Sequence, residues 1–374
     1  MGTVLFFCQS ALRKKRTVPI FFIFLSTRWQ RIGCAWLVAC LITGCAHLHP
    51  VATAPTAAAP SDTTAYYAYP HTPITPTVEL LSEHEGYTVE RVRWPLVPPP
   101  AGPTEGRSDI SWSPTSTSDG LLRRPHAGGG MATTDGLEES ERTIEVEWYE
   151  SSQPGQRAAL LVLPILGGNY PIERAFCRFF AYRGIHCALI HRRTMKFTTS
   201  ASPTDLEALL RRAVIRNRQV CDWLETQPSV DAARLGVFGI SMGGMLGVMT
   251  AAVEPRVKAL VAGLAGGGIA DVLCHTRDPI LTRPRARYLA KQGLTLEELH
   301  RRLADGIRTD PLRLALYVDS RRVLMIMARL DRTIPTAERL ALWRALGQPD
   351  TLRLPAGHYS SIVLVPVVIN LPNQ

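Results

Sequence analysis

Leu235-Gly236-Val237-Phe238-Gly239-Ile240-Ser241-Met242-Gly243-Gly244 is the stretch that decides the fold. A short apolar run ends in Gly-x-Ser-x-Gly-Gly, and small and apolar residues follow it. This order predicts a buried strand, a sharp turn and a helix, with Ser241 at the turn. The glycines two positions before and after Ser241 remove Cβ atoms that would collide in such a turn. Ser241 is therefore a candidate nucleophile, and the N–H of Met242 is a candidate donor to an oxyanion.

Apolar runs and amphipathic stretches alternate on both sides of this turn. Continuous apolar runs at residues 158–164, 185–191 and 323–328 predict strands buried on both faces. Helical patterns at residues 171–183 and 203–225 lie between them. Together they predict a mostly parallel sheet with helices on both faces, an α/β fold. In such a sheet the loops after the strands gather at one edge, where a site is expected.

Two further loops at that edge carry an acid and a base. Asp331 follows the predicted strand at residues 323–328, and His358 follows a short predicted strand at residues 351–354. A serine hydroxyl is a poor nucleophile until a base takes its proton, and a carboxylate must hold that base in the right tautomer. Ser241, His358 and Asp331 are therefore a candidate catalytic triad.

Other acids and histidines fit this site less well. Asp271 is the best alternative acid, whereas Asp319 precedes a predicted strand and so lies at the opposite edge. His191 also follows a strand, but its neighbours Arg192 and Arg193 indicate a solvated or substrate-facing loop. An anionic substrate is one reading of these arginines, and solvated surface is the preferred one.

The order serine, aspartate, histidine, each just after a strand, resembles the α/β-hydrolase superfamily. The matching segments are residues 239–244, Asp331 with Ile334-Pro335 behind it, and Gly357-His358. The likeness is to the broad branch of dienelactone hydrolases and prolyl-oligopeptidase-like esterases, over roughly residues 80–370. It implies an α/β-hydrolase fold and a serine hydrolase, with Ser241 as nucleophile, His358 as general base and acid, and Asp331 orienting the imidazole.

The resemblance also implies a second oxyanion donor and a cap. In the superfamily the donor comes from the loop after the third strand, here Leu166-Gly167-Gly168. Pro164-Ile165 stands where the superfamily has a His-Gly pair, so Leu166 is the expected donor beside Met242, with Gly167 next. Residues 265–320 show helical patterns without a strand and occupy the place of a helical cap over the substrate pocket.

The N-terminal region has the layout of a signal peptide. Residues 1–44 contain basic residues, an apolar run and then small residues, and residues 41–46 resemble the lipobox of bacterial lipoproteins. This resemblance implies lipidation of Cys45 and a lipid-anchored protein facing the periplasm in the bacterial cell envelope. A plain apolar anchor is the alternative. The Ala-, Pro- and Thr-rich residues 45–78 predict a disordered tether.

The hydrolase domain is then expected over residues 79–370, with a disordered loop at residues 95–141. The whole chain has a formal net charge of +10, and most of its basic residues are arginine. No basic run has interleaved aromatic residues, so no nucleic-acid partner is expected.

No metal or organic cofactor is expected either, because the chain shows neither a ligand cluster nor a dinucleotide fingerprint. The cysteines of the predicted domain fit buried thiols and disulfides equally well; they are Cys177, Cys187, Cys221 and Cys274. The sequence thus predicts an exported, lipid-anchored serine hydrolase that cleaves a small-molecule carboxylic ester through an acyl-enzyme. A peptidase or acyltransferase with the same triad, and a non-catalytic envelope lipoprotein that keeps the fold, are the alternatives.

Overall fold

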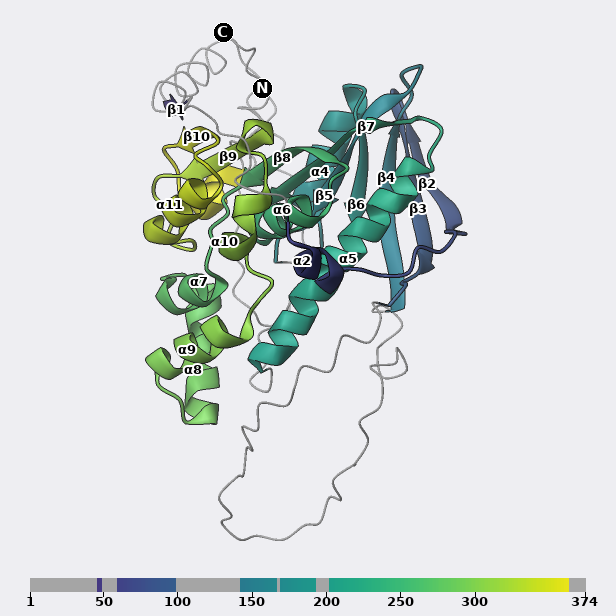
Figure 1. Ribbon diagram of the computed structural model, residues 1–374. Coiled ribbons are helices and arrows are strands. Elements are labelled where there is room, and N and C mark those ends of the chain that lie inside the picture. The colour runs from purple at the N-terminus through teal and green to yellow at the C-terminus, as the bar shows by residue number, and fades with distance from the viewer. Residues whose placement is uncertain (1–45, 49–58, 99–141, 167–168, 193–201, 363–374) are drawn as a thin grey trace, which may run out of the picture. The chain divides into compact units, whose positions relative to one another are not determined.

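The computed structural model describes residues 46–48, 59–98, 142–166, 169–192 and 202–362. These residues belong to one compact unit, and they form a ten-stranded sheet with helices on both faces (Figure 1). The predicted signal peptide with Cys45, most of the predicted loop at residues 95–141, and Gly167 lie outside the described residues.

The sheet has the strand order β1-β10-β9-β8-β7-β5-β6-β4-β3-β2. Its strands are β1 (Ala46–Leu48), β2 (Thr77–His84), β3 (Tyr87–Pro95), β4 (Thr143–Ser151), β5 (Arg157–Leu163), β6 (His186–Ile190), β7 (Val230–Ile240), β8 (Val257–Gly263), β9 (Val323–Ala328) and β10 (Asp350–Leu354). The helices are α2 (Ser61–Tyr66), α4 (Pro171–Tyr182), α5 (Pro203–Glu225), α6 (Met242–Val253), α7 (Ile269–His275), α8 (Pro279–Gln292), α9 (Leu296–Gly306), α10 (Pro311–Leu314) and α11 (Thr336–Ala345), with 3-10 turns η2 (Ala315–Tyr317) and η3 (Ser320–Arg322).

The six strands from β10 to β6 pair in parallel, whereas the outer strands pair antiparallel. Strand β7 lies in the middle of the parallel part, where Phe238 is opposite Val162 of β5 and Val261 of β8. The predicted, mostly parallel α/β-hydrolase sheet is confirmed. Because β7 is central, the turn after Ile240 opens at the middle of the carboxyl edge.

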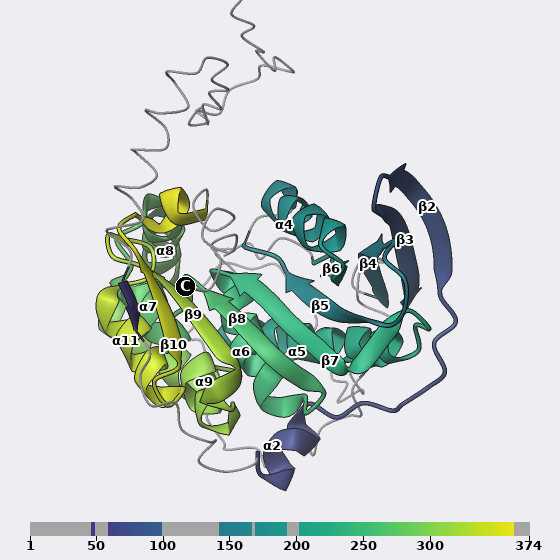
Figure 2. The same cartoon turned by 90° about the horizontal axis from the view of Figure 1, so that it is seen from above.

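Two apolar clusters fill the two faces of the sheet. Successive residues of β7 point to opposite faces, so Val237 lies in one cluster and Phe238 in the other. The cluster with Val237 includes Leu246 of α6, and the cluster with Phe238 includes Phe176 of α4. Figure 2 shows α4 on one side of the sheet and α5 and α6 on the other. The core therefore holds β7 and the start of α6 between rigid layers.

The folded unit begins earlier than the predicted boundary at Glu79. Strand β1 pairs with β10, and α2 is followed by two tyrosines that are almost fully buried, Tyr67 and Tyr69. The Tyr69 hydroxyl donates to Asp222 Oδ2 at 2.7 Å. Composition alone favoured a tether, but these rings bury apolar area and their hydroxyl groups find partners on the domain. This part of the predicted tether is packed on the folded unit.

Strand β2 crosses the predicted start of the domain at residue 79. It is an edge strand that pairs only with β3, and it has no buried residue. Val78 and Leu80 are 56% and 55% exposed, so neither face shows the alternation that identifies a half-buried strand. The pattern was absent because no face of β2 is covered.

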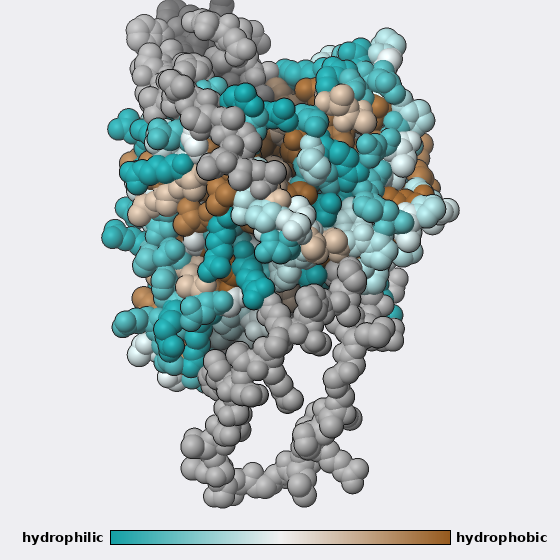
Figure 3. Space-filling model, viewed as in Figure 1, coloured by the Kyte–Doolittle hydropathy of each residue, from teal (hydrophilic) through white to brown (hydrophobic). Residues whose placement is uncertain are grey.

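The segment between β8 and β9 is helical throughout its described elements. Helix α8 has no buried residue, and the region of α8 and α9 is largely polar on the face shown in Figure 3. Among the described residues, no helix combines the length and apolar character needed to cross a bilayer.

Candidate active site

Ser241 occupies a strained turn between β7 and α6. Its backbone has φ 57° and ψ −119°, a region that residues with a Cβ atom rarely adopt. Its N–H donates to the carbonyl oxygen of Gly263 at 2.7 Å, which ties the turn to the end of β8. This geometry presents the Ser241 side chain at the edge of the sheet, directly before the N-terminus of α6.

Two glycines make this turn possible. A Cβ atom on Gly239 would overlap the carbonyl oxygen of Gly243, and one on Gly243 would overlap the carbonyl oxygen of Leu163. Backbone atoms on both sides cannot move away without breaking the sheet or the first turn of α6. The Gly-x-Ser-x-Gly pattern is therefore a steric requirement of this fold.

The structure brings Ser241, His358 and Asp331 together. His358 Nε2 lies 3.0 Å from Ser241 Oγ, and His358 Nδ1 lies 2.8 Å from Asp331 Oδ2. Because an ionised carboxylate only accepts, Nδ1–H donates to Asp331 and Nε2 is free to accept from the Ser241 hydroxyl. His358 is 5% exposed and Asp331 is 9% exposed, so the pair is largely shielded from water.

The loops that carry the acid and the base are joined by their backbones. The N–H groups of Arg329 and Leu330 donate to the carbonyl oxygens of Leu354 and Ala356 at 2.9 and 3.0 Å. Asp331 Oδ1 accepts two further backbone hydrogen bonds, from the N–H groups of residues 333 and 334 at 2.8 and 2.9 Å. The carboxylate is thereby fixed on one side and faces His358 on the other.

Leu166, the predicted second oxyanion donor, follows a peptide that is held by charged side chains. The N–H of Ile165 donates to Glu173 Oε1 at 2.7 Å. Arg192 Nη2 donates to the carbonyl oxygens of Pro164 and Ile165 at 3.1 and 2.7 Å. Met242, the other predicted donor, is the first residue of α6, and N–H groups there have no acceptor within the helix.

Arg192 was predicted to face solvent, and the structure corrects this. Its guanidinium turns inward onto the loop after β5, and burial lowers the pKa of Arg192 to about 10, so it remains a cation at neutral pH. Its backbone is also held, because its N–H donates to the Tyr170 hydroxyl at 2.8 Å and its carbonyl accepts from that hydroxyl at 2.6 Å. Arg192 thus holds the loop in place, whereas Arg193 lies outside the described residues.

The alternative residues have other partners. Asp271 lies 2.7 Å from His300 Nε2, and Asp319 pairs with Arg321. His191 lies 3.0 Å from Glu145 and 2.9 Å from Glu147. None of these contacts involves Ser241, so the described structure assembles only one Ser-His-Asp chain.

Sequence reasoning missed Asp278, a second carboxylate beside this chain. It is 5% exposed, and its Oδ2 accepts hydrogen bonds from the hydroxyl groups of Thr333 and Tyr359, each at 2.6 Å. The sequence places a tyrosine next to His358, but it does not show which residue binds the tyrosine hydroxyl. Asp278-Pro279 is typical of an ordinary helix start, so Asp278 gave no sign of a second role.

The described residues hold no group of three or more histidine, cysteine, aspartate or glutamate side chains placed to bind a metal ion. The four cysteines of the domain are buried free thiols.

Comparisons with known proteins identify the type of enzyme. A model of the prolyl oligopeptidase family matches residues 213–354, which include Ser241 and Asp331. Acetyl xylan esterase 1 from Thermoanaerobacterium sp. JW/SL YS485 is similar in structure, with a TM-score of 0.56, 14% identity, and coverage of 85% of this chain and 96% of that one. An acetyl xylan esterase from Paenibacillus sp. R4 has a TM-score of 0.55 and 15% identity, over 82% and 92% of the two chains. No curated protein matches the sequence. The chain is a serine hydrolase with an α/β-hydrolase fold.

Proposed function

We propose that the protein hydrolyses a carboxylic ester through an acyl-enzyme on Ser241. The observation that carries this proposal is the continuous chain of hydrogen bonds from Ser241 Oγ through His358 to Asp331, at 3.0 and 2.8 Å. A serine with a base in hydrogen-bond contact, and a carboxylate behind that base, is the arrangement that activates a hydroxyl group.

The reaction follows from these contacts. His358 Nε2 takes the proton of Ser241 as Oγ bonds to the ester carbonyl carbon, and Asp331 stabilises the imidazolium. The N–H groups of Met242 and Leu166 bind the oxyanion of the tetrahedral intermediate. His358 then gives its proton to the departing alcohol, which leaves an acyl group on Ser241. Water repeats the sequence with His358 as base, and it releases the carboxylic acid.

Esters with a short acyl group are the first substrate class to examine. Two acetyl xylan esterases share this fold, which supports an acetyl ester of a carbohydrate-like alcohol. A peptidase is the second candidate, because the matching family model is that of prolyl oligopeptidases. Both reactions use the same nucleophile, so only the substrate distinguishes them.

Two measurements test the proposal. A fluorophosphonate probe should label the wild-type protein but not Ser241→Ala, and absence of labelling would favour a non-catalytic envelope protein.

Initial rates on p-nitrophenyl esters of graded chain length, compared with p-nitroanilides of short peptides, then separate the esterase from the peptidase. Rates that are higher on the anilides than on every ester would overturn the proposed ester reaction.

We also propose that the protein is exported and anchored by lipid at Cys45. The support is the lipobox-like end of the apolar segment, Leu41-Ile42-Thr43-Gly44-Cys45. Two or three acyl chains would hold the protein firmly, because one chain alone binds a membrane only marginally. Mass spectrometry of the mature N-terminus decides the matter. Cys45→Ser should abolish both lipidation and cleavage, whereas an unmodified Cys45 within an uncleaved wild-type chain would indicate a plain apolar anchor.

A further inference from the structure

Asp278 connects the helical insert to both loops that carry the catalytic acid and base. It lies between α7 and α8, and its Oδ2 accepts from Thr333, two residues after Asp331, and from Tyr359, next to His358. Nearby, the N–H of Arg277 donates to the carbonyl oxygen of Arg332 at 3.1 Å. One buried carboxylate therefore contacts both loops at once.

Tyr359 places this contact beside the imidazole. The rings of His358 and Tyr359 lie edge to face, with centroids 5.4 Å apart and planes at 80°. The Tyr359 side chain therefore contacts both Asp278 and His358. The hydrogen bond to Asp278 fixes the position of the Tyr359 hydroxyl and with it the direction of the side chain.

Asp278 is also electrostatically coupled to the base. Burial by itself would raise the pKa of the Asp278 carboxyl, but hydrogen bonds from Thr333, Tyr359 and the N–H of Ile280, together with the charge on His358, outweigh burial and hold the pKa below its usual value.

We propose that Asp278 is a positioning residue for catalysis, which fixes Tyr359 against His358 and adds a second negative charge near the imidazolium. The inference rests on the proposed function for its catalytic meaning. In the reaction, His358 becomes positively charged twice, and each time Asp278 stabilises that charge without touching the substrate.

The simpler role for Asp278 is to cap α8, whose residue Ile280 donates its N–H to Oδ1 at 2.9 Å. Asparagine caps helices about as well as aspartate, so Asp278→Asn keeps the cap, removes the charge and puts an NH2 group in place of the oxygen that accepts from Thr333 and Tyr359. Asp271→Asn is the matched control, since it makes the same change in α7, where the partner is His300.

The experiment follows the titration of His358 by NMR, through the low-field proton on Nδ1, in the wild type and in each variant. The groups that contact this imidazole are Asp331, the Ser241 hydroxyl and Tyr359. Asp278 is bonded to Tyr359, and the exposed Arg277 and Arg332 are the nearby basic residues of the two loops. Asp278→Asn should move the titration midpoint to lower pH by about one unit, since a nearby negative charge is lost. Asp271→Asn should leave it in place.

Turnover gives the second readout. Asp278→Asn should lower kcat for an ester substrate about tenfold, as one charge-assisted contact predicts, and the acidic limb of the kcat/KM profile should move to lower pH. Tyr359→Phe should lower kcat less and leave the limb in place, because the charge on Asp278 remains. An Asp278→Asn protein with the midpoint and kcat of Asp271→Asn would show that Asp278 only caps α8.

The two proposals can fail separately. If the wild-type protein hydrolyses no ester and takes no fluorophosphonate, the proposed function fails, but the NMR titration still decides whether Asp278 acts on His358. If labelling is normal and the midpoint does not move, the proposed function stands and this inference is wrong.

Discussion

The two ends of α6 are built in opposite ways. At its start, Ser241 is strained and gives no side-chain cap, so the N–H groups of the first turn are left for the site. At its end, Glu254 is buried and bonded by Arg256 at 2.7 Å and by Arg218 at 3.3 Å. A helix of twelve residues spans about 18 Å, so these ends lie at opposite edges of the sheet. One end keeps its polar groups available, and the other satisfies them within the protein.

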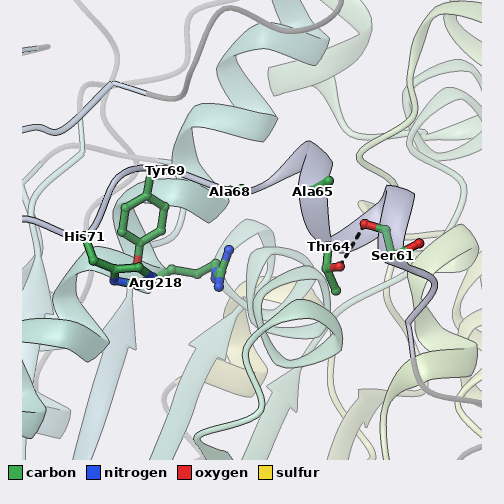
Figure 4. A pocket seen from close by; sticks show the side chains of 7 residues that line it. All are labelled: Ser61, Thr64, Ala65, Ala68, Tyr69, His71 and Arg218. Carbon is green, nitrogen blue, oxygen red and sulfur yellow. Dashed lines mark hydrogen bonds between the residues drawn. The ribbon is translucent and has the colours of Figure 1, made fainter.

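A hollow at the second end sharpens the contrast. It has a volume of about 280 Å³ and is lined by α2 and by Tyr69, His71 and Arg218, which Figure 4 shows. Its polar groups are bonded to neighbours: Arg218 donates to the carbonyl oxygen of Tyr67 at 2.6 Å, and Tyr69 donates to Asp222. A search for hollows alone would have placed the active site at this edge of the sheet. The hydrogen-bonded Ser241, His358 and Asp331 lie at the opposite edge.

The largest expected effect is at Ser241. Ser241→Ala should lower ester hydrolysis by about a million-fold, as loss of the serine does in a model protease, while the unfolding free energy changes little. Initial rates and urea unfolding measure the two quantities. Ser152→Ala is the control and should keep full activity, because Ser152 is exposed and distant in sequence from Ser241. A rate for Ser241→Ala within tenfold of wild type would remove the proposed nucleophile.

Asp331→Asn should lower kcat by about ten-thousand-fold, because the amide favours the wrong imidazole tautomer. Asp271→Asn tests the alternative acid, and it should change kcat by no more than about twofold, since surface substitutions generally have small effects. Single-turnover kinetics on the same ester compare the two. Greater damage from Asp271→Asn would show that the acid is misassigned.

Glu254→Gln tests the other end of the helix. It should lower the unfolding free energy by about 3 kcal/mol at pH 7, because it removes the buried carboxylate that both Arg218 and Arg256 contact. Burial alone would raise the pKa of Glu254, but hydrogen bonds and charge from Arg256, with the charge of Arg218, lower it. The stabilisation is therefore complete above the unfolded-state pKa of about 4.3 and is lost as the pH falls further.

Urea unfolding of the wild type and Glu254→Gln at pH 7 and at pH values below 4 measures this difference. The kcat of the folded variant should equal that of the wild type. A large fall in kcat without a fall in stability would break the separation between the two ends of α6.

An effect on turnover much smaller than at the triad is expected at the loop after β5. Arg192→Met should lower kcat about tenfold, because the carbonyl oxygens of Pro164 and Ile165 lose their donor and the neighbouring N–H of Leu166 is less well placed. Affinity for a trifluoromethyl ketone, which mimics the oxyanion, should fall in the same ratio. Arg183→Met is the control, because Arg183 also donates to a backbone carbonyl but lies at the end of α4. Equal loss in both variants would point to a general effect on folding.

The central part of the fold could be predicted because its signals are local. The apolar run before Ser241 and the glycines around it specify strand, turn and helix without reference to distant residues. The contact of Arg192 with the loop after β5 could not be predicted, because an arginine next to another arginine is typical of an exposed surface. Only the folded chain shows that Arg192 donates to two carbonyl oxygens of that loop. The same holds for Asp278, whose helix-cap role is local and whose contact with Tyr359 spans 81 positions.

The strained backbone of Ser241 has a consequence for how the protein can change over time. A conformation of this kind costs about 1 kcal/mol or more, and glycine adopts it without that cost. Ser241→Gly should therefore raise the unfolding free energy by about 1 kcal/mol while abolishing turnover. Selection for heat resistance alone would favour loss of the reactive residue, so the serine persists only under selection for the reaction itself.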